Sequence, residues 1–355
     1  MSASEATENP QGVQYVLDIL HKRQRDWESQ NWIAAEVGRH LQHRLQKSHP
    51  FLRGAKWQLV GSAAEHLSVS EADDKDLIFT LGPPYTPQFF SAVYMGSGLY
   101  QLKWNKSFWN GHRPQHLNSS DYLVVTSLRK QAYDCINSVL ENNHISRLKV
   151  TKVMLWKQAV RVVLRDTSTK KKHIVDVILQ IAGGQWNNIQ GLTQWGNLPP
   201  ALQDVITSLE TAGQPSVSFG LHGPPGTSSL TVTTSYSVLE REFFLEHSNV
   251  RNAVLLAKVI ISGHNWKNKF GLKGAHVKRL AMKHFLVLRH CLPWPGMKLL
   301  LQVMVDQLQS GALEGYPDFD SDLFWQKTDE QCQYIAKIVQ SVMLTLVPNF
   351  LANYL

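Results

Sequence analysis

Three aspartates in this sequence have the spacing to bind divalent cations. Asp74 and Asp76 lie two residues apart at the start of an apolar segment, predicted as the strand Asp76–Leu81. Because side chains alternate between the two faces of a strand, both carboxylates are expected on the same side. Two neighbouring carboxylates repel each other, and a bound divalent cation usually offsets that repulsion. The spacing therefore indicates a cation site, with an acidic surface loop as the alternative.

The third acid, Asp176, lies in the middle of a β-branched segment that is predicted as the strand His173–Ile181. Aspartate is rare in strands, and burying it without a partner is costly. Either Asp176 forms an ion pair with a neighbouring arginine such as Arg161, or it shares the cation site of Asp74 and Asp76. We favour the shared site, because the adjacent strand already offers two carboxylates that need a cation.

Three carboxylates on two neighbouring strands can hold a pair of Mg²⁺ or Mn²⁺ ions about 3.5–4 Å apart. Asp74 and Asp76 would then hold the ion that orients a triphosphate and offsets charge on the leaving pyrophosphate. Asp176 would help to bind the second ion and would draw the proton from an attacking ribose hydroxyl.

Gly61 and Ser62 have the properties of a phosphate-binding turn. Glycine permits close approach of the backbone, and the serine would cap a following helix whose free N–H groups favour a terminal phosphate. The alternative is an ordinary N-cap serine. Joined to the Asp-x-Asp and its hydrophobic strand, however, the Gly-Ser pair is fairly specific for the nucleotidyltransferase superfamily.

From about residue 13 to about 290 the chain resembles cyclic GMP–AMP synthase and its cGAS-like receptor relatives. The resemblance rests on several motifs: Gly-Ser-x-x-Glu-His at 61–66, Asp-x-Asp at 74–76, Val-Asp-Val-Ile-Leu around Asp176, Ser-Tyr-Ser-Val-Leu-Glu-Arg-Glu at 235–242 and His-Val-Lys at 276–278. It implies an α+β nucleotidyltransferase fold with a mixed β-sheet core and a long N-terminal spine helix. A C-terminal helical bundle would follow, with the active site in the cleft between sheet and bundle.

The resemblance also implies roles for further residues. Lys258 falls where the family places a phosphate-contacting lysine, and Ser235, Ser237 and Glu240 fall near the nucleotide. The family joins two nucleoside triphosphates, such as ATP and GTP, into a cyclic dinucleotide that activates the STING receptor, usually after double-stranded nucleic acid orders the active site. Two alternatives stay open: a catalytically silent nucleotide-binding scaffold of the same fold, and a synthase of linear oligonucleotides.

The chain departs from the family at three places. His247 stands where the family's zinc thumb begins, but no cysteine follows it, so no structural zinc is expected. Thumb-less relatives include receptors for double-stranded RNA, which favours RNA over DNA as the activator. Ala275 and Thr233 replace a base-stacking tyrosine and an arginine of the family, so the identity of the cyclic product stays open.

The charge distribution points to a polyanionic partner. The net charge is +8, and no Asp or Glu occurs from His247 to Val305. Such a window suits a phosphate-rich ligand, although solvated helix faces are the plain alternative. The residues expected to contact nucleic acid are Lys267, Lys269 and Lys273 in this window and Lys22, Arg23 and Arg44 on the spine helix.

Hydrophobic periodicity predicts an α+β half followed by a helical half. One long helix is expected over 13–47, a hairpin of Val153–Arg165 with His173–Ile181, and helices from Val238 onward. The segment Gly213–Thr227 is rich in Gly, Pro and Ser and is predicted as a boundary or mobile loop. The expected organisation is a flexible tail at 1–12, a nucleotidyltransferase core at 13–210 and a helical C-terminal lobe at 211–355.

Composition narrows the location of the protein. No stretch of about 18 apolar residues occurs, so no membrane span is expected. Three widely spaced cysteines, Cys135, Cys291 and Cys332, form no disulfide framework and suit a reducing compartment. A cytoplasmic location is therefore expected.

Overall fold

A computed structural model describes most of the chain. It covers residues 10–48, 52–69, 75–106, 113–141, 143–156, 159–223, 226–314, 316–318, 322, 324, 327–347 and 351. Most of the tail expected at 1–12, and Asp74, lie outside these residues. Residues 10–12 belong to the first helix, because that helix begins at Pro10, a residue type favoured in the first helical turn.

The β-rich segments of the chain form one mixed sheet of ten strands within the described residues. Eight strands follow the order β3-β4-β10-β9-β8-β7-β6-β5, and β2 joins β8 with β1 beyond it. All pairs are antiparallel except β2 with β8. The strands are β1 (Lys56–Val60), β2 (Lys75–Thr80), β3 (Phe90–Gly96), β4 (Leu99–Trp104), β5 (His144–Ile145), β6 (Leu148–Trp156), β7 (Ala159–Asp166), β8 (Lys172–Gly184), β9 (Val217–Gly220) and β10 (Thr231–Ser235).

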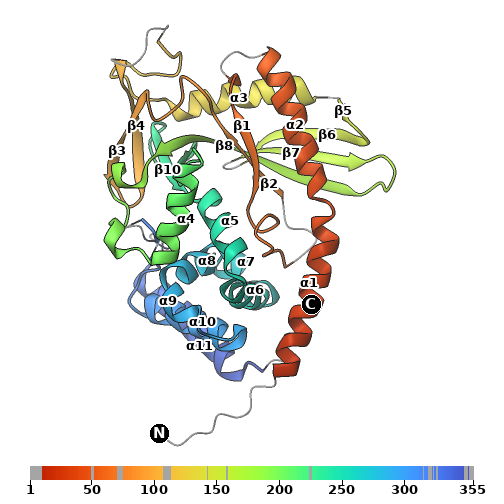
Figure 1. Cartoon of the computed structure of the whole chain (residues 1–355), viewed down its shortest axis with the longest axis vertical. Coiled ribbons are helices and arrows are strands. Elements are labelled where there is room, and N and C mark those ends of the chain that lie inside the picture. The colour runs from red at the N-terminus through yellow and green to blue at the C-terminus, as the bar shows by residue number, and fades with distance from the viewer. Residues whose placement is uncertain are drawn as a thin grey trace, which may run out of the picture.

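The long helix predicted over 13–47 is two helices, α1 (Pro10–Glu28) and α2 (Asn31–Ser48). Ser29 and Gln30 form the turn between them, where the Ser29 hydroxyl donates to the Asp26 carbonyl at 2.6 Å. The predicted apolar stripe is buried in both helices. Together they run along one side of the molecule, with α2 beside the sheet and α1 beside the other helices (Figure 1).

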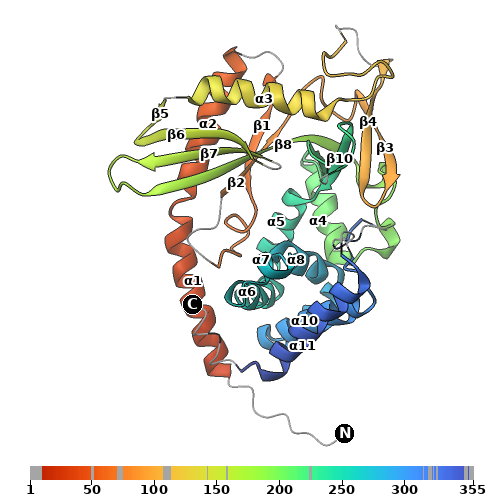
Figure 2. The same cartoon turned by 180° about the vertical axis from the view of Figure 1, so that it is seen from behind.

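The remaining helices cover the sheet and build the second half of the molecule. Seen from behind, α3 lies across the sheet end, while α6, α8, α10 and α11 gather at the opposite end (Figure 2). The helix α6 is buried along most of its length and packs on α8 and α10. These helices are α3 (Val125–Leu140), α4 (Pro200–Thr211), α5 (Ser237–Glu246), α6 (Ser248–Gly263), α7 (Trp266–Phe270), α8 (Gly274–Lys283), α9 (Phe285–Leu288), α10 (Pro293–Gln309) and α11 (Asp329–Thr345).

Two expected elements and the expected boundary at residue 210 differ from the structure. The segment predicted as the strand Val153–Arg165 spans the end of β6 and most of β7. The segment predicted as a loop, Gly213–Thr227, contains the buried strand β9, which pairs with β8 and β10. Sheet structure therefore continues past residue 210, up to Ser235, and the helical part begins with α5. The Gly, Pro and Ser content of Gly213–Thr227 concealed β9, because only four residues carry the β pattern.

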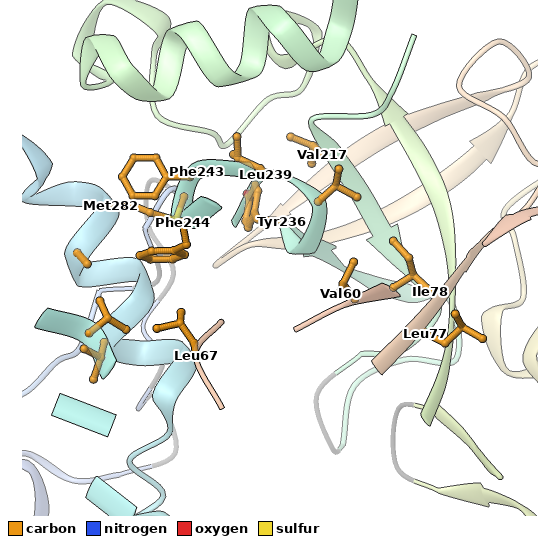
Figure 3. Packing of buried hydrophobic residues seen from close by; sticks show 14 of the residues in the cluster. Val60, Leu67, Leu77, Ile78, Val217, Tyr236, Leu239, Phe243, Phe244 and Met282 are labelled. Atoms are coloured by element: carbon orange, nitrogen blue, oxygen red, sulfur yellow. The ribbon is translucent and has the colours of Figure 1, made fainter. Parts of the chain in front are cut away.

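A continuous apolar core joins the sheet to the helices. Figure 3 shows members from both parts, among them Val60 and Ile78 on strands and Phe244 and Met282 on helices. This core includes residues of the carboxyl-bearing strands β2 and β8 and of α5, α6 and α8. The α+β prediction is confirmed, and no helix in the described ranges has the length and apolar character required to span a membrane.

Candidate active site

Three charged side chains stand in a row across three neighbouring strands. Asp76 of β2 pairs with Asp176 of β8 in the parallel register, and Asp176 pairs with Arg161 of β7 in the antiparallel register. Directly paired residues project from the same face of a sheet. We call Asp76, Asp176 and Arg161 the aspartate row.

Asp176 is engaged by arginine. Arg161 donates from Nε to Oδ1 at 2.7 Å and from Nη2 to Oδ2 at 2.6 Å, so both carboxylate oxygens accept a hydrogen bond. The side chains of Asp176 and Arg161 are only 12% and 17% exposed. The ion pair that the sequence analysis ranked second is therefore present, because strand register places a guanidinium directly beside the acid.

Asp76 faces a different surrounding. It lies against the turn at Gly61, which has a φ of +75° and where an added Cβ would approach Oδ2 of Asp76 to 2.4 Å. Only glycine combines this backbone angle with room for the carboxylate. Asp76 borders two cavities, and Asp176 borders neither of them.

The first cavity has a volume of about 410 Å³ and is bordered by four lysines. We call it the lysine-rich cavity, after Lys258, Lys267, Lys273 and Lys278. Gly61, Ser62 and Asp76 form its sheet side, and the first residues of α8 form part of its helical side. Lysines and the start of a helix both favour phosphate groups.

Lys258 connects the helical part to the turn that follows β1. It is buried on α6, and its Nζ donates to Ser62 Oγ at 2.7 Å and to the Leu67 carbonyl. An added Cβ at Gly274 would lie 2.7 Å from Cε of Lys258, so glycine at this position leaves room for the lysine. The structure thus brings together Ser62 and Lys258, which the sequence assigned separately to phosphate binding.

The second cavity has a volume of about 530 Å³ and is bordered by many hydroxyl groups. We call it the hydroxyl-rich cavity, after Ser97, Thr233, Thr234, Ser235, Tyr236 and Ser237. The Oγ atoms of Ser235 and Ser237 lie 3.3 Å apart. Gly61, Asp76, Lys273, Ala275 and Lys278 border both cavities, so the two meet at Asp76.

A buried aspartate that sequence reasoning missed organises this second cavity. Asp318 accepts hydrogen bonds from Thr234 Oγ1 at 2.9 Å and from the Tyr236 hydroxyl at 2.6 Å. Arg279 lies 3.6 Å from Oδ2 of Asp318 and stacks over the Tyr236 ring. Burial and the nearby Asp318 carboxylate raise the pKa of Tyr236 well above its usual value. Asp318 lies outside any recognisable motif, so only the tertiary fold brings it to the site.

A second charge cluster, the lysine–glutamate triad, lies beside the cavities: Lys278 borders both of them, and Glu65 is fully buried. Nζ of Lys278 donates to both carboxylate oxygens of Glu65 at 2.9 Å and also to Glu240. Burial raises the pKa of Glu65, whereas Lys278 opposes that rise. Burial also opposes the charge on Lys278, but Glu240 and Glu65 raise its pKa above the usual value. Glu240, expected near the nucleotide, borders the hydroxyl-rich cavity but is bound to Lys278.

Two histidines in the wall of the hydroxyl-rich cavity are held neutral. Burial lowers the pKa of His276 to about 3, with repulsion from Lys273 and Arg279 adding to the effect. Burial lowers the pKa of His222 to about 4, and Arg129 adds to it. His222 Nε2 lies 3.3 Å from the Thr233 hydroxyl, and its Nδ1 has no hydrogen-bond partner within the described residues.

The residues expected to contact nucleic acid are divided between cavity and surface. Lys267 and Lys273 border the lysine-rich cavity, while Lys269 is exposed on the same short helix as Lys267. Lys22, Arg23 and Arg44 are exposed on α1 and α2. A smaller cavity of about 260 Å³ adds two arginines that the sequence analysis did not select, Arg25 and Arg251.

The donor set allows a partial fit to divalent cations. Asp76 offers a carboxylate at the junction of the cavities, and Asp176 stands beside it in register. No cluster of three His, Cys, Asp or Glu side chains suited to a cation occurs in the described part of the chain, from which Asp74 is missing. His247, discussed above for zinc, packs against Phe243 and Phe285. The absence of zinc stays a prediction.

No protein-family model matches this chain, and a search of curated proteins found no match either. The functional assignment therefore depends on the motifs and on the geometry of the site.

Proposed function

We propose that this chain is a nucleotidyltransferase that joins two nucleoside triphosphates into a cyclic dinucleotide. The observation that carries the proposal is the position of Asp76. Asp76 lies on β2, packed against Gly61, at the place where the lysine-rich and the hydroxyl-rich cavity meet. A transfer between two nucleotides needs a carboxylate at such a junction, with phosphates on one side and an acceptor sugar on the other.

The lysine-rich cavity suits the triphosphate of the donor nucleotide. Lys273 extends into both cavities, and Lys258 holds the Ser62 hydroxyl at the turn. These groups would bind phosphate oxygens by charge and by hydrogen bonds, which positions the reacting phosphorus. Asp76 and Asp176, with Asp74, would hold two Mg²⁺ or Mn²⁺ ions, which supply charge neutralisation at the phosphates and activation of the acceptor hydroxyl.

The hydroxyl-rich cavity suits a sugar and a base. Ser235, Ser237 and Thr233 offer hydroxyl groups that accept and donate hydrogen bonds. The neutral ring of His222 adds a nitrogen atom with no partner among the described residues. These groups differ from the arginine and tyrosine of the related enzymes, so the base composition of the product is left to experiment.

The nucleic-acid trigger and the signalling role extend this proposal. Exposed basic residues on α1, α2 and α7 support a polyanionic activator, and a basic helical face suits A-form RNA, which is bound largely through its shape and phosphates. We propose double-stranded RNA as the activator, a cytosolic location, and a STING-type receptor as the target of the product.

A labelled-nucleotide assay tests the proposal. The protein is incubated with the four ribonucleoside triphosphates and Mg²⁺ or Mn²⁺, alone or with double-stranded RNA or DNA. A phosphatase-resistant dinucleotide that forms with wild type but not with Asp76→Asn is the expected result. A ladder of linear products would replace the cyclase by an oligonucleotide synthase.

One observation favours a second candidate, a catalytically silent nucleotide-binding scaffold. Both oxygens of Asp176 are engaged by Arg161, and a permanent ion pair there would weaken the binding of a second cation. Nucleotide binding without turnover, with and without each duplex, would establish the scaffold and overturn the enzyme.

A further inference from the structure

The contact between Arg161 and Asp176 has the geometry of a strong ion pair. Two nearly parallel hydrogen bonds, at 2.7 and 2.6 Å, join the fork of the guanidinium to both carboxylate oxygens. Bidentate pairs of this kind are stronger than pairs made by a single ammonium group. The low exposure of both side chains limits screening by water and salt.

Arg161 is also held from its outer side. Its guanidinium carbon lies 5.1 Å from the centre of the Trp156 ring, a cation–π contact at the end of the β6–β7 hairpin. The guanidinium thus also packs over the Trp156 ring. Arg161 therefore has a second partner for its charge besides the carboxylate of Asp176.

The aspartate row as a whole carries two negative charges and one positive charge. A divalent cation that binds Asp176 would coordinate an oxygen that already accepts a hydrogen bond from Arg161, and it would lie close to the positive guanidinium. Asp76 differs, because it borders both cavities and faces the Gly61 turn. The two carboxylates therefore present unequal sites, although their strands place them side by side.

We propose that Arg161 is an internal counter-cation of Asp176, whose charge competes with a divalent cation for that carboxylate. This inference rests on the proposed function only in treating Asp176 as a cation ligand. Cation binding is consequently ordered: the Asp76 side binds more tightly, and the Asp176 side binds weakly beside Arg161. Arg161 thereby sets the metal concentration at which the second site is occupied.

Mn²⁺ titration, followed by the electron paramagnetic resonance of the free ion, tests this order without nucleotide or turnover. Wild type is expected to show one stronger and one weaker site. Arg161→Gln should tighten the weaker site about tenfold or more, because the carboxylate no longer has a competing cation. Unchanged Mn²⁺ binding in Arg161→Gln would overturn the proposal, since Arg161 would then not compete with the cation for Asp176.

Arg165→Gln is the matched control. Arg165 lies on the same strand and is exposed, and its Nε donates a long hydrogen bond of 3.4 Å to the Lys170 carbonyl. The substitution Arg165→Gln removes the same charge from the protein and leaves the contact between Arg161 and Asp176 unchanged. Equal tightening in Arg165→Gln and Arg161→Gln would reduce the effect to net charge and would reject the specific role of Arg161.

Two further variants cover a failure of Arg161→Gln to fold. Arg161→Lys keeps the charge but loses the fork, so tightening of a smaller size is expected. The double variant Arg161→Gln/Asp176→Asn keeps a neutral pair of similar shape and should lose the weaker site. A double variant that still binds two ions would contradict the proposal. A chain that makes no dinucleotide but shows the Mn²⁺ effect would refute the proposed function and leave this inference intact.

Discussion

The lysine–glutamate triad and the aspartate row have the same composition of charges, two carboxylates and one cation, but different surroundings. In the triad, Glu65, Glu240 and Lys278 are at most 9% exposed and come from three elements that are distant in sequence. The aspartate row lies across adjacent strands, and one of its members borders both cavities. Lys278 of the triad also borders both cavities, but it is bound to two buried carboxylates from distant segments. The triad therefore joins parts of the fold, whereas Asp76 of the row brings a carboxylate to the junction of the cavities.

Burial determines which of these clusters can exchange partners. A sealed charge cluster adds little net stability over an apolar equivalent, but removing one member leaves an uncompensated charge that is costly. A carboxylate beside a cavity meets water or a cation when its neighbour moves. Substitutions in the triad should consequently change stability, and substitutions in the row should change catalysis and metal binding.

The largest expected effect follows from removing the cation of the triad. Lys278→Met leaves Glu65 and Glu240 buried together without a partner, and should lower the free energy of unfolding by about 3–5 kcal/mol. Urea unfolding measures this loss. The control is Lys283→Met on the same helix, whose pair with Glu314 is more exposed and should matter by less than about 1 kcal/mol. Equal stability of the two variants would show that the triad is not a structural junction.

The counterpart in the aspartate row is Asp76→Asn. We expect it to lower kcat about a thousandfold, because the junction of the cavities loses its charged ligand, while the free energy of unfolding changes by less than about 1 kcal/mol. Turnover of nucleoside triphosphates and urea unfolding give the two numbers. A variant that loses stability but keeps the wild-type kcat per folded molecule would show that Asp76 has a structural role, as the triad does.

Acid should destabilise the helical wall of the hydroxyl-rich cavity through His276. Its pKa is about 3 in the folded chain and about 6.5 when unfolded, so the unfolded chain binds more protons between these values. The stabilisation is complete above pH 6.5 and falls by roughly 1.4 kcal/mol per pH unit below it, or about 2 kcal/mol at pH 5.

His276→Asn tests this origin of the acid sensitivity. Asparagine retains an acceptor near the position of Nδ1, which accepts a hydrogen bond from the Lys273 amide. Urea unfolding at pH 5, 6 and 7.5 should show a flatter profile for this variant than for wild type. Residual slope is expected from His222, whose pKa is also lowered, to about 4. An unchanged profile would show that His276 is protonated in the folded chain.

Sequence patterns predicted the elements better than the partners of the charged residues. The 3.6-residue periodicity predicts helices from Val238 onward, and the structure has helices there, but the five-residue α7 is too short to show that periodicity and was not predicted. The sequence predicted that the strands of Asp76 and Asp176 are neighbours, but it did not predict the register that places the two residues side by side. Local periodicity carries such information, since each element buries one face.

The remaining features depend on contacts between distant segments. Glu65 and Lys278 are separated by 213 residues, and Asp318 reaches the cavity from a segment that follows α10. No local pattern marks these pairs, because their partners are set by the packing of α5 and α8 against the sheet. Strand register places Arg161 directly beside Asp176, and periodicity alone does not determine that register.

The smallest expected effect separates the inside of the lysine-rich cavity from its outside. Lys267 borders the cavity and Lys269, two residues later on α7, is exposed. If double-stranded RNA is the activator, Lys269→Glu should lower the slope of log affinity against log salt by about one and leave the KM for nucleotide unchanged. Lys267→Glu should instead raise the KM. If both variants alter RNA binding alone, the lysine-rich cavity belongs to the activator rather than to the substrate.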